Sequence, residues 1–401
     1  MLDRRKFGIT AAALLGACAA PREPDSEPSG PDSPLYFDLH IDTPGRLVAE
    51  RLNIAESPVY SQVDIPKMRQ GGLNAGFFAV FSSARDKTPI ESVKDALRIT
   101  DVVVETVNRH PDDLFLGLVA DDAVRAQRED RIAVFLGVEG GHMIDSSVGV
   151  LRQLFRLGTR YLGLTHSGNT PWVGAAEYPD DGPEGLTDQG REIVREMNRM
   201  GMMADLSHAS EKAFYDTIET SSAPILNTHA ACTAIANHPR NLTDDMLKAL
   251  SQNGGVLGVA YYAGMLDDEY RARFPELREI GRKRAEVRRE FAGDFKRLSE
   301  ELWKLNLAEV DTIGAPPLSR LVDHIEHAAT VAGIDHVGLG SDYDSVGLKL
   351  PVGMEHIGKT PNLVTALRER GFSEEDVGKV MGGNVLRAVR EAEGVAAASG
   401  A

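Results

Sequence analysis

Cysteine is almost absent from this sequence: the 401 residues include only Cys18 and Cys232. A framework of intrachain disulfides is therefore excluded. The glycine-rich fingerprint of dinucleotide-binding folds, Gly-x-Gly-x-x-Gly, is also missing. Positive charge is scarce, because 44 Lys and Arg face 60 Asp and Glu and leave a net charge of −16. Such a balance disfavours nucleic acid as a partner and favours a small-molecule enzyme or a binding protein.

The N-terminal segment has the pattern of an export signal. Residues 4–7 (Arg-Arg-Lys-Phe) precede an apolar run from Ile9 to Leu15, the layout of a bacterial twin-arginine signal. This run is too short to span a membrane. It leads into Leu15-Gly16-Ala17-Cys18, a sequence similar to a lipoprotein cleavage box, which predicts lipid anchoring of Cys18 on the periplasmic side of a bacterial membrane. The alternative is an ordinary signal peptide cut one or two residues later.

Composition divides the chain into four segments. Residues 1–18 are assigned to the export signal, and residues 19–34, rich in Pro, Ser, Asp and Glu, are predicted to be a disordered tether that cannot bury a core. We expect one large domain over residues 35–393, followed by a tail of small residues at 394–401. With 42% hydrophobic residues, the chain has enough apolar material for such a domain.

Apolar runs alternate with helical patterns along this domain about eight times, which favours parallel strands joined by helices. At this length the pattern predicts a (β/α)8 TIM-like barrel, a fold of typically ~250 residues, with insertions. An open doubly wound sheet is the alternative, but the missing dinucleotide fingerprint gives it no support. Residues 267–310 are too highly charged for barrel core, so we interpret them as a helical insertion or lid.

Several of the predicted strands end in His, Glu or Asp. His40 and Asp42 are two residues apart on one strand, so their side chains point to the same face. The ends of parallel barrel strands meet at one mouth, where active sites lie. A mixed set of imidazoles and carboxylates suits zinc and similar ions. Five residues are therefore candidate metal ligands: His40, Asp42, Glu139, His208 and His229.

Five ligands are more than one catalytic zinc requires, and they fit two Zn²⁺ ions that share a carboxylate and hold a bridging hydroxide. Glu139 is the candidate for the shared ligand, because its strand lies between the strand of His40 and those of the two later histidines.

Six motifs, in the same order, resemble those of the membrane dipeptidase (renal dipeptidase) family of dinuclear zinc peptidases. The resemblance extends from about Asp38 to Arg390. The motifs are Asp38-Leu39-His40-Ile41-Asp42, Gly137-Val138-Glu139-Gly140-Gly141-His142, Leu164-Thr165-His166-Ser167-Gly168-Asn169-Thr170-Pro171-Trp172, Asp205-Leu206-Ser207-His208, Pro239-Arg240-Asn241-Leu242-Thr243-Asp244-Asp245 and Gly338-Leu339-Gly340-Ser341-Asp342-Tyr343-Asp344.

The resemblance implies that His40 and Asp42 bind one zinc ion, that His208 and His229 bind the other, and that Glu139 bridges them. It also implies three further roles. His166 would contact the substrate and stabilise the tetrahedral intermediate, Arg240 would bind the substrate carboxylate, and Asp342 would be the catalytic acid and base. Each residue type suits its role, since oxyanions need donors, guanidinium groups fork onto carboxylates, and carboxylates carry protons.

We therefore expect zinc-dependent hydrolysis of dipeptides, including dipeptides with a D-residue at the C-terminal position. The first alternative is another metal-dependent barrel hydrolase, acting on lactones, cyclic amides or phosphotriesters. The second is an exported lipoprotein that binds peptides or metal without turnover. The expected partners are a small dipeptide and, through Cys18 alone, a membrane, with no nucleic acid; whether the chain forms a homodimer stays open.

Overall fold

In a computed structural model, the chain is described over residues 34–85, 87–177 and 181–400. The described strands form a parallel barrel that closes through pairing of β2 with β4 and of β1 with both β2 and β9. The closed ring is made of β1 (Tyr36–Ile41), β2 (Leu73–Phe81), β4 (Ile132–Glu139), β5 (Thr159–Gly163), β6 (Met203–Asp205), β7 (Leu226–Ala230), β8 (Val256–Ala260) and β9 (Val337–Gly340).

The predicted (β/α)8 barrel is thus confirmed, and the open doubly wound alternative is wrong because the sheet closes on itself. One short strand, β3 (Leu114–Leu116), has no counterpart in the sequence prediction. It pairs with the first residues of β4, whereas β5 pairs with the last residues of that strand. The two short strands, β3 and β5, therefore lie one after the other along the same edge of β4.

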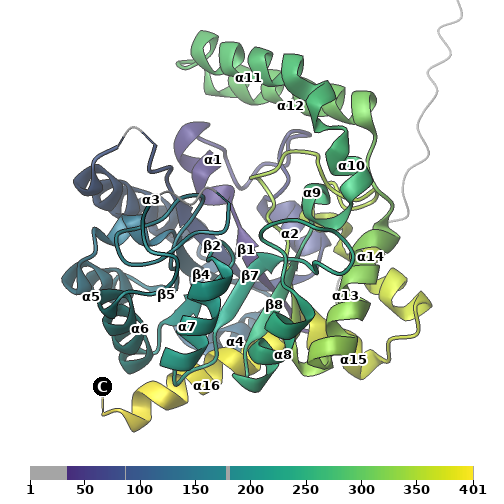
Figure 1. Ribbon diagram of the computed structural model, residues 1–401. Coiled ribbons are helices and arrows are strands. Elements are labelled where there is room, and N and C mark those ends of the chain that lie inside the picture. Colours follow the sequence, from purple (N-terminus) through teal and green to yellow (C-terminus); the bar gives the residue numbers. More distant parts are fainter. Residues whose placement is uncertain (1–33, 86, 178–180, 401) are drawn as a thin grey trace, which may run out of the picture.

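Helices surround the barrel (Figure 1). Among the described residues, no helix combines the length and apolarity needed to cross a bilayer. The helices are α1 (Thr43–Ala49), α2 (Ile65–Gln70), α3 (Pro89–Arg109), α4 (Ala120–Glu129), α5 (Val148–Arg156), α6 (Asp188–Met200), α7 (Glu211–Thr220), α8 (Asp244–Gln252), α9 (Ala263–Leu266), α10 (Asp268–Ala272), α11 (Arg278–Glu290), α12 (Phe295–Ile313), α13 (Leu318–Ala332), α14 (Thr360–Glu369), α15 (Glu374–Gly378) and α16 (Asn384–Ala398).

Aromatic side chains fill the interior of the barrel. The rings of Phe37 and Phe135 lie 5.0 Å apart between centroids, and those of Phe77 and Tyr161 also lie 5.0 Å apart. All four side chains are buried. Gly137 makes room for the Tyr161 ring, because a Cβ at this glycine would approach ring atoms to 2.0 Å. The packed rings form a rigid floor beneath the mouth of the barrel.

The charged segment predicted as an insertion is helical and projects from the barrel. It lies between β8 and β9 and contains α10, α11 and α12. Figure 1 shows α11 and α12 as two neighbouring helices above α1. No residue of α11 is buried, which agrees with its high charge.

Helix α16 runs beneath the barrel, at the end opposite to α11 and α12 (Figure 1). It continues to Ala398, through residues that we expected to be a tail of small residues. The reason is packing, because Ala396 is buried and Val395 contacts the apolar cluster around Phe77. The predicted export signal at 1–18 and the tether at 19–34, apart from Pro34, lie outside the described residues.

Candidate metal centre and active site

The eight residues singled out from the sequence gather at the C-terminal mouth of the barrel. Strands bring some of them there directly, and the loops that follow the strands bring the others. His40 is in β1 and Asp42 directly follows it; Glu139 ends β4; His166 follows β5; His208 follows β6; His229 is in β7, with Arg240 in the loop after it; and Asp342 follows β9.

Glu139 lies at the centre of this group. Its Oε2 is 3.6 Å from Nε2 of His40. Its Oε1 is 2.9 Å from Nε2 of His208 and 3.5 Å from Nε2 of His229. Nε2 of His40 is in turn 3.6 Å from Oδ2 of Asp42. The two oxygens of one carboxylate thus face two different sets of possible ligands.

Ligand atoms converge closely enough to hold cations. Within each of three groups of side chains, one ligand atom from every member lies within 4.8 Å of the others. His40 belongs to two of these groups, and Glu139 also belongs to two. The groups are His40 with Asp42 and Glu139; Glu139 with His166 and His208; and His40 with His229 and Asp342.

His40 is held from behind by a buried hydrogen bond. Its Nδ1 is 2.9 Å from the hydroxyl of Tyr161 and 3.4 Å from Oγ1 of Thr228. Its Nε2 is buried and has no hydrogen-bond partner among the described residues. If Nδ1–H donates to Tyr161, Nε2 presents a lone pair to the centre. A buried nitrogen without a partner costs free energy unless a cation occupies the space before it, so this side chain fits a metal site.

The two later histidines are also oriented by buried contacts. Nδ1 of His229 is 2.9 Å from Oγ1 of Thr228. Oδ1 of Asp205 accepts hydrogen bonds from the backbone N–H groups of Ser207 and Thr228, at 3.2 and 2.8 Å. These contacts tie β6 to β7 and place Nε2 of His208 3.1 Å from Nε2 of His229. Two ring nitrogens at this distance, both directed at Glu139, form one ligand pair.

The electrostatics favour the protonation states that metal ligands need. Burial lowers the pKa values of His208 and His229 well below the usual range, and Arg240 lowers them further. Burial acts to raise the pKa of Glu139, but His40 and His166 outweigh it and hold this pKa well below its usual range. Neutral imidazoles beside an ionised carboxylate are the forms that coordinate a cation.

His40 behaves differently, because it is beside two carboxylates. Burial acts to lower its pKa, but Glu139 and Asp42 outweigh burial and raise the pKa well above the usual range. The negative charge of the two carboxylates therefore attracts positive charge to Nε2, whether a proton or a metal cation.

Asp342 lies against the same centre in a strained backbone conformation. Its φ is 59°, in the left-handed region that non-glycine residues seldom adopt. Its backbone N–H donates to the carbonyl oxygen of His40 at 3.0 Å, which holds the loop after β9 against β1. Burial, and then the charge of Asp42, raise the pKa of Asp342 well above its usual range. This carboxyl is therefore well placed to hold a proton.

His166 and Arg240 flank the centre. The His166 ring lies 4.3 Å from the Phe81 ring and 4.2 Å from the His208 ring, and its side chain is 27% exposed. Arg240 donates from Nε to the carbonyl oxygen of Ser207 at 3.0 Å and from Nη2 to that of His229 at 3.2 Å. The guanidinium is thus fixed at the mouth by backbone groups next to the histidines.

Two residues of this site, Glu177 and Tyr161, have no functional signal in the sequence. Glu177 has one carboxylate oxygen 3.9 Å from both Nδ1 of His208 and Nη1 of Arg240. It lies in a loop without periodicity, so no local pattern indicates it. Tyr161 supports His40 from the barrel interior. Its position two residues before Gly163 on β5 indicates which face it occupies but not which side chain it contacts.

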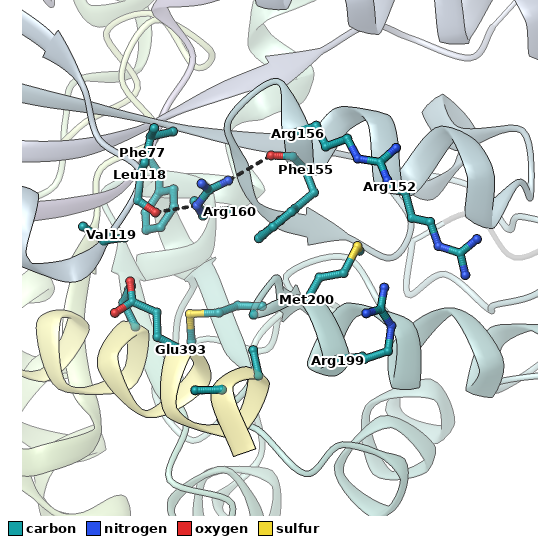
Figure 2. A pocket seen from close by; sticks show the side chains of 15 residues that line it. Phe77, Leu118, Val119, Arg152, Phe155, Arg156, Arg160, Arg199, Met200 and Glu393 are labelled. Atoms are coloured by element: carbon teal, nitrogen blue, oxygen red, sulfur yellow. Dashed lines mark hydrogen bonds between the residues drawn. The ribbon is translucent and has the colours of Figure 1, made fainter. Parts of the chain in front are cut away.

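A separate cavity of about 490 Å³ lies at the opposite end of the barrel, between β5, β6 and α16 (Figure 2). Four arginines line it, and three of them already have partners. Arg152 and Arg199 share Glu196, at 2.6 and 2.7 Å. Arg160 donates to the carbonyl oxygens of Leu118 and Phe155, as the dashed lines in Figure 2 show. This cavity includes none of the candidate ligands and is not part of the metal centre.

The segment Gly353–Thr360 has the letters of a phosphate-binding loop, Gly, four residues, then Gly-Lys-Thr. Its surroundings differ from that motif, which lies directly between a strand and a helix. Here β9 ends at Gly340, well before the segment. The Thr360 hydroxyl is buried and donates to the carbonyl oxygen of Ile357 at 2.7 Å. The pattern therefore does not indicate a nucleotide site.

Comparison with known proteins identifies the family of the chain. The family model described as membrane dipeptidase (peptidase family M19) matches residues 32–401. An uncharacterized dipeptidase of Schizosaccharomyces pombe, C965.12, is 34% identical over 378 residues, which cover 90% of this chain and 80% of that protein. Dipeptidase tcpJ of Claviceps purpurea is 33% identical over 369 residues, which cover 90% of this chain and 75% of that protein.

Solved structures have the same fold. The crystal structure of dipeptidase AC, a metallo peptidase of family M19, has a TM-score of 0.74 and 24% identity, covering 90% of this chain and 99% of that one. A metallo peptidase from Rhodobacter sphaeroides, liganded with a phosphinate mimic of the dipeptide L-Ala-D-Ala, has a TM-score of 0.73 and 23% identity with the same coverage. Because the family model spans the whole described barrel and the two dipeptidases exceed 30% identity, the chain belongs to the membrane dipeptidase family, whose metal-dependent hydrolysis of dipeptides it shares.

Proposed function

We propose that this chain is a two-zinc dipeptidase. His40 and Asp42 would hold one ion, His208 and His229 would hold the other, and Glu139 would bridge the two. One observation carries the assignment: Oε2 of Glu139 faces His40, whereas Oε1 faces His208 and His229. When bound, the two zinc ions would polarise the scissile carbonyl and supply a bridging hydroxide near neutral pH.

Arg240 would hold the free carboxylate of the substrate. Its Nε and Nη2 are engaged by backbone carbonyls, so the plane of the guanidinium is fixed. Its Nη1 lies 3.9 Å from Glu177, too far for a hydrogen bond, so it remains able to donate to a ligand. A carboxylate held here limits the substrate to one residue beyond the scissile bond, which favours dipeptides over longer peptides.

His166 and Asp342 would act on the reacting bond. Nδ1 of His166 is 2.8 Å from Oγ of Ser167, a contact that orients the ring and leaves Nε2 directed at the centre. From there Nε2–H would donate to the oxygen that becomes negative. Asp342 would take the proton of the attacking water as an ionised carboxylate and return it to the leaving amine. Its raised pKa favours holding that proton between the two steps.

A D-residue at the C-terminal position is part of the proposal. Its support is the ligand of the Rhodobacter sphaeroides metallo peptidase, a mimic of L-Ala-D-Ala, together with the shared fold. Arg240 would hold the terminal carboxylate of an L- or a D-residue in the same way. The preference between the two configurations therefore depends on the residues around the substrate's C-terminal side chain.

The test is hydrolysis of a panel of L,L- and L,D-dipeptides beside matched tripeptides, with zinc-loaded and chelator-treated protein. We expect metal-dependent cleavage of dipeptides, little cleavage of tripeptides, and about two zinc ions per chain by mass spectrometry. Cleavage of lactones or cyclic amides in place of dipeptides would favour the other hydrolase class. Bound metal without cleavage of any peptide would contradict the proposed activity.

We also propose export and lipid anchoring through Cys18. The proposal rests on the twin arginines at positions 4 and 5 and on the lipoprotein-like box that ends at Cys18. In a bacterial host, the native chain should sediment with membranes, and Cys18→Ser should release it without loss of dipeptidase activity. Soluble native protein cut after Cys18 would contradict lipid anchoring.

A further inference from the structure

The helical insertion and the mouth of the barrel line an open pocket of about 320 Å³, which we call the hairpin pocket. This volume is within the range of small-ligand sites, roughly 300–1,000 Å³. Helix α11 contributes Arg284 and Arg288, the loop after β9 contributes Ser345 and Lys349, and the end of β8 leads to Tyr262. Among the described lining residues there are three cations and no carboxylate.

The hairpin pocket keeps a net positive charge after its ion pairs are counted. Glu309 of α12 lies behind it, with one oxygen 2.8 Å from Nη2 of Arg284 and the other 2.7 Å from Nζ of Lys349. The side chain of Arg288 makes no hydrogen bond or ion pair with the part of the chain that the structure describes. Three cations against one carboxylate leave +2 in a chain whose total charge is −16. This local excess attracts anions.

The hairpin pocket adjoins the metal centre. Ser345, on its wall, donates its backbone N–H to the carbonyl oxygen of Asp342 at 3.4 Å. The loop after β9 is joined to the end of β8, because the N–H of Ala263 donates to the carbonyl oxygen of Lys349 at 2.9 Å. Tyr262, directly before Ala263, lines the pocket, and burial and then the charge of Asp342 raise the pKa of its hydroxyl, while Arg240 opposes them.

This arrangement places the C-terminal residue of the substrate nearer to the hairpin pocket. In the proposed mechanism Arg240 holds the terminal carboxylate and Asp342 serves the leaving amine, and both groups belong to the C-terminal residue. The carbonyl oxygen of Asp342 accepts a hydrogen bond from Ser345, which lines the hairpin pocket. The side chain of the C-terminal residue therefore lies closer to the hairpin pocket than that of the N-terminal residue.

We propose that the hairpin pocket receives an acidic side chain at the C-terminal position, so that the enzyme prefers dipeptides that end in Asp or Glu. Arg288 contributes one of the two positive charges that no carboxylate neutralises. Arg284 and Lys349, which share Glu309, together contribute the other. The inference rests on the proposed function and names its substrate class.

The experiment measures kcat/KM of the zinc-loaded full chain for alanyl-glutamate, alanyl-glutamine, alanyl-lysine, glutamyl-alanine and glutaminyl-alanine. For alanyl-glutamate over alanyl-glutamine we expect a preference of about fivefold, the size of a partly exposed ion pair. Glutamyl-alanine should show no such advantage over glutaminyl-alanine. The preference should shrink at high salt, because the pocket is open to solvent.

Arg288→Gln should abolish most of this preference by lowering kcat/KM for alanyl-glutamate much more than for alanyl-glutamine. The variant should fold, since Arg288 is exposed. Arg289→Gln is the matched control: the same helix loses the same charge one residue later, at an exposed position outside the pocket lining. Arg288→Glu should shift the preference towards alanyl-lysine.

The outcomes separate this inference from the proposed function. Hydrolysis of alanyl-glutamine with no preference for alanyl-glutamate, or a preference that Arg288→Gln leaves intact, would overturn the inference and leave the dipeptidase assignment standing. A preference for glutamyl-alanine would overturn the assigned position. If zinc-loaded protein cleaves no dipeptide, both proposals are wrong.

Discussion

Replacement of Tyr161 by Phe tests whether the barrel interior prepares the metal centre. The hydroxyl of Tyr161 is 2.9 Å from Nδ1 of His40, and both side chains are buried. The remaining contact, to Oγ1 of Thr228 at 3.4 Å, is long, and that oxygen is already 2.9 Å from Nδ1 of His229. Thr228 therefore cannot fully replace the lost partner.

The expected size follows from this geometry. Loss of the partner of one buried polar group costs about 1–3 kcal/mol of folding free energy. Loss of a partner behind a metal-bound imidazole typically lowers metal affinity about 10- to 100-fold, or roughly 1.4–2.7 kcal/mol. We expect Tyr161→Phe to show both effects, because the hydroxyl both satisfies and orients His40.

The assay is zinc affinity by competition with a chromophoric chelator, together with thermal unfolding of the metal-free protein. Tyr343→Phe is the matched control, since Tyr343 is also buried and donates to the carbonyl oxygen of Met354 at 3.0 Å. The control should lose comparable stability and retain zinc affinity. Equal zinc affinity in Tyr161→Phe and the native chain would refute the orienting role, and so would an equal loss of affinity in Tyr343→Phe.

Three further measurements address separate features. His166→Leu should lower kcat far more than zinc affinity, by about 100-fold if it removes an oxyanion donor; unchanged turnover would refute its role. Cys232 is buried and its pKa is raised to about 12, so at pH 8 it should have only about 1 thiolate in 10⁴, and the Cys18→Ser chain should react with a disulfide reagent only after unfolding. Gly394→Ala, at an exposed position of α16 with nothing within 4 Å of the added Cβ, should raise the free energy of unfolding by about 0.5–1 kcal/mol, whereas a frayed tail would give no change.

The candidate metal ligands could be found from the sequence because their signals are local. An apolar run that ends in His or Glu indicates both a buried strand and the chemistry at its end. The structure places Glu139 at the last position of β4 and His229 within β7. His166 also follows an apolar run, whereas Arg240 lies in a loop without one. The catalytic and substrate-binding roles of both residues came only from the resemblance of whole motifs.

Helix ends and short strands that depend on tertiary packing could not be predicted from local sequence patterns. The sequence after residue 394 is mostly small residues, which are typical of a tail, yet α16 continues because the bottom of the barrel offers Ala396 an apolar surface. Strand β3 has three residues and pairs only with the beginning of β4. Neither feature has a local pattern strong enough to indicate it.

The sequence by itself determined the barrel, its charged insertion and the residue types of the metal centre, since alternation and motif order are properties of neighbouring residues. The tertiary structure decided which distant side chains meet. Tyr161 reaches His40 across 121 positions of the chain. Arg284 and Lys349 share Glu309 because the insertion folds back on the loop after β9. Such contacts depend on how the barrel closes and how the insertion packs, and these are long-range relations that no window of sequence contains.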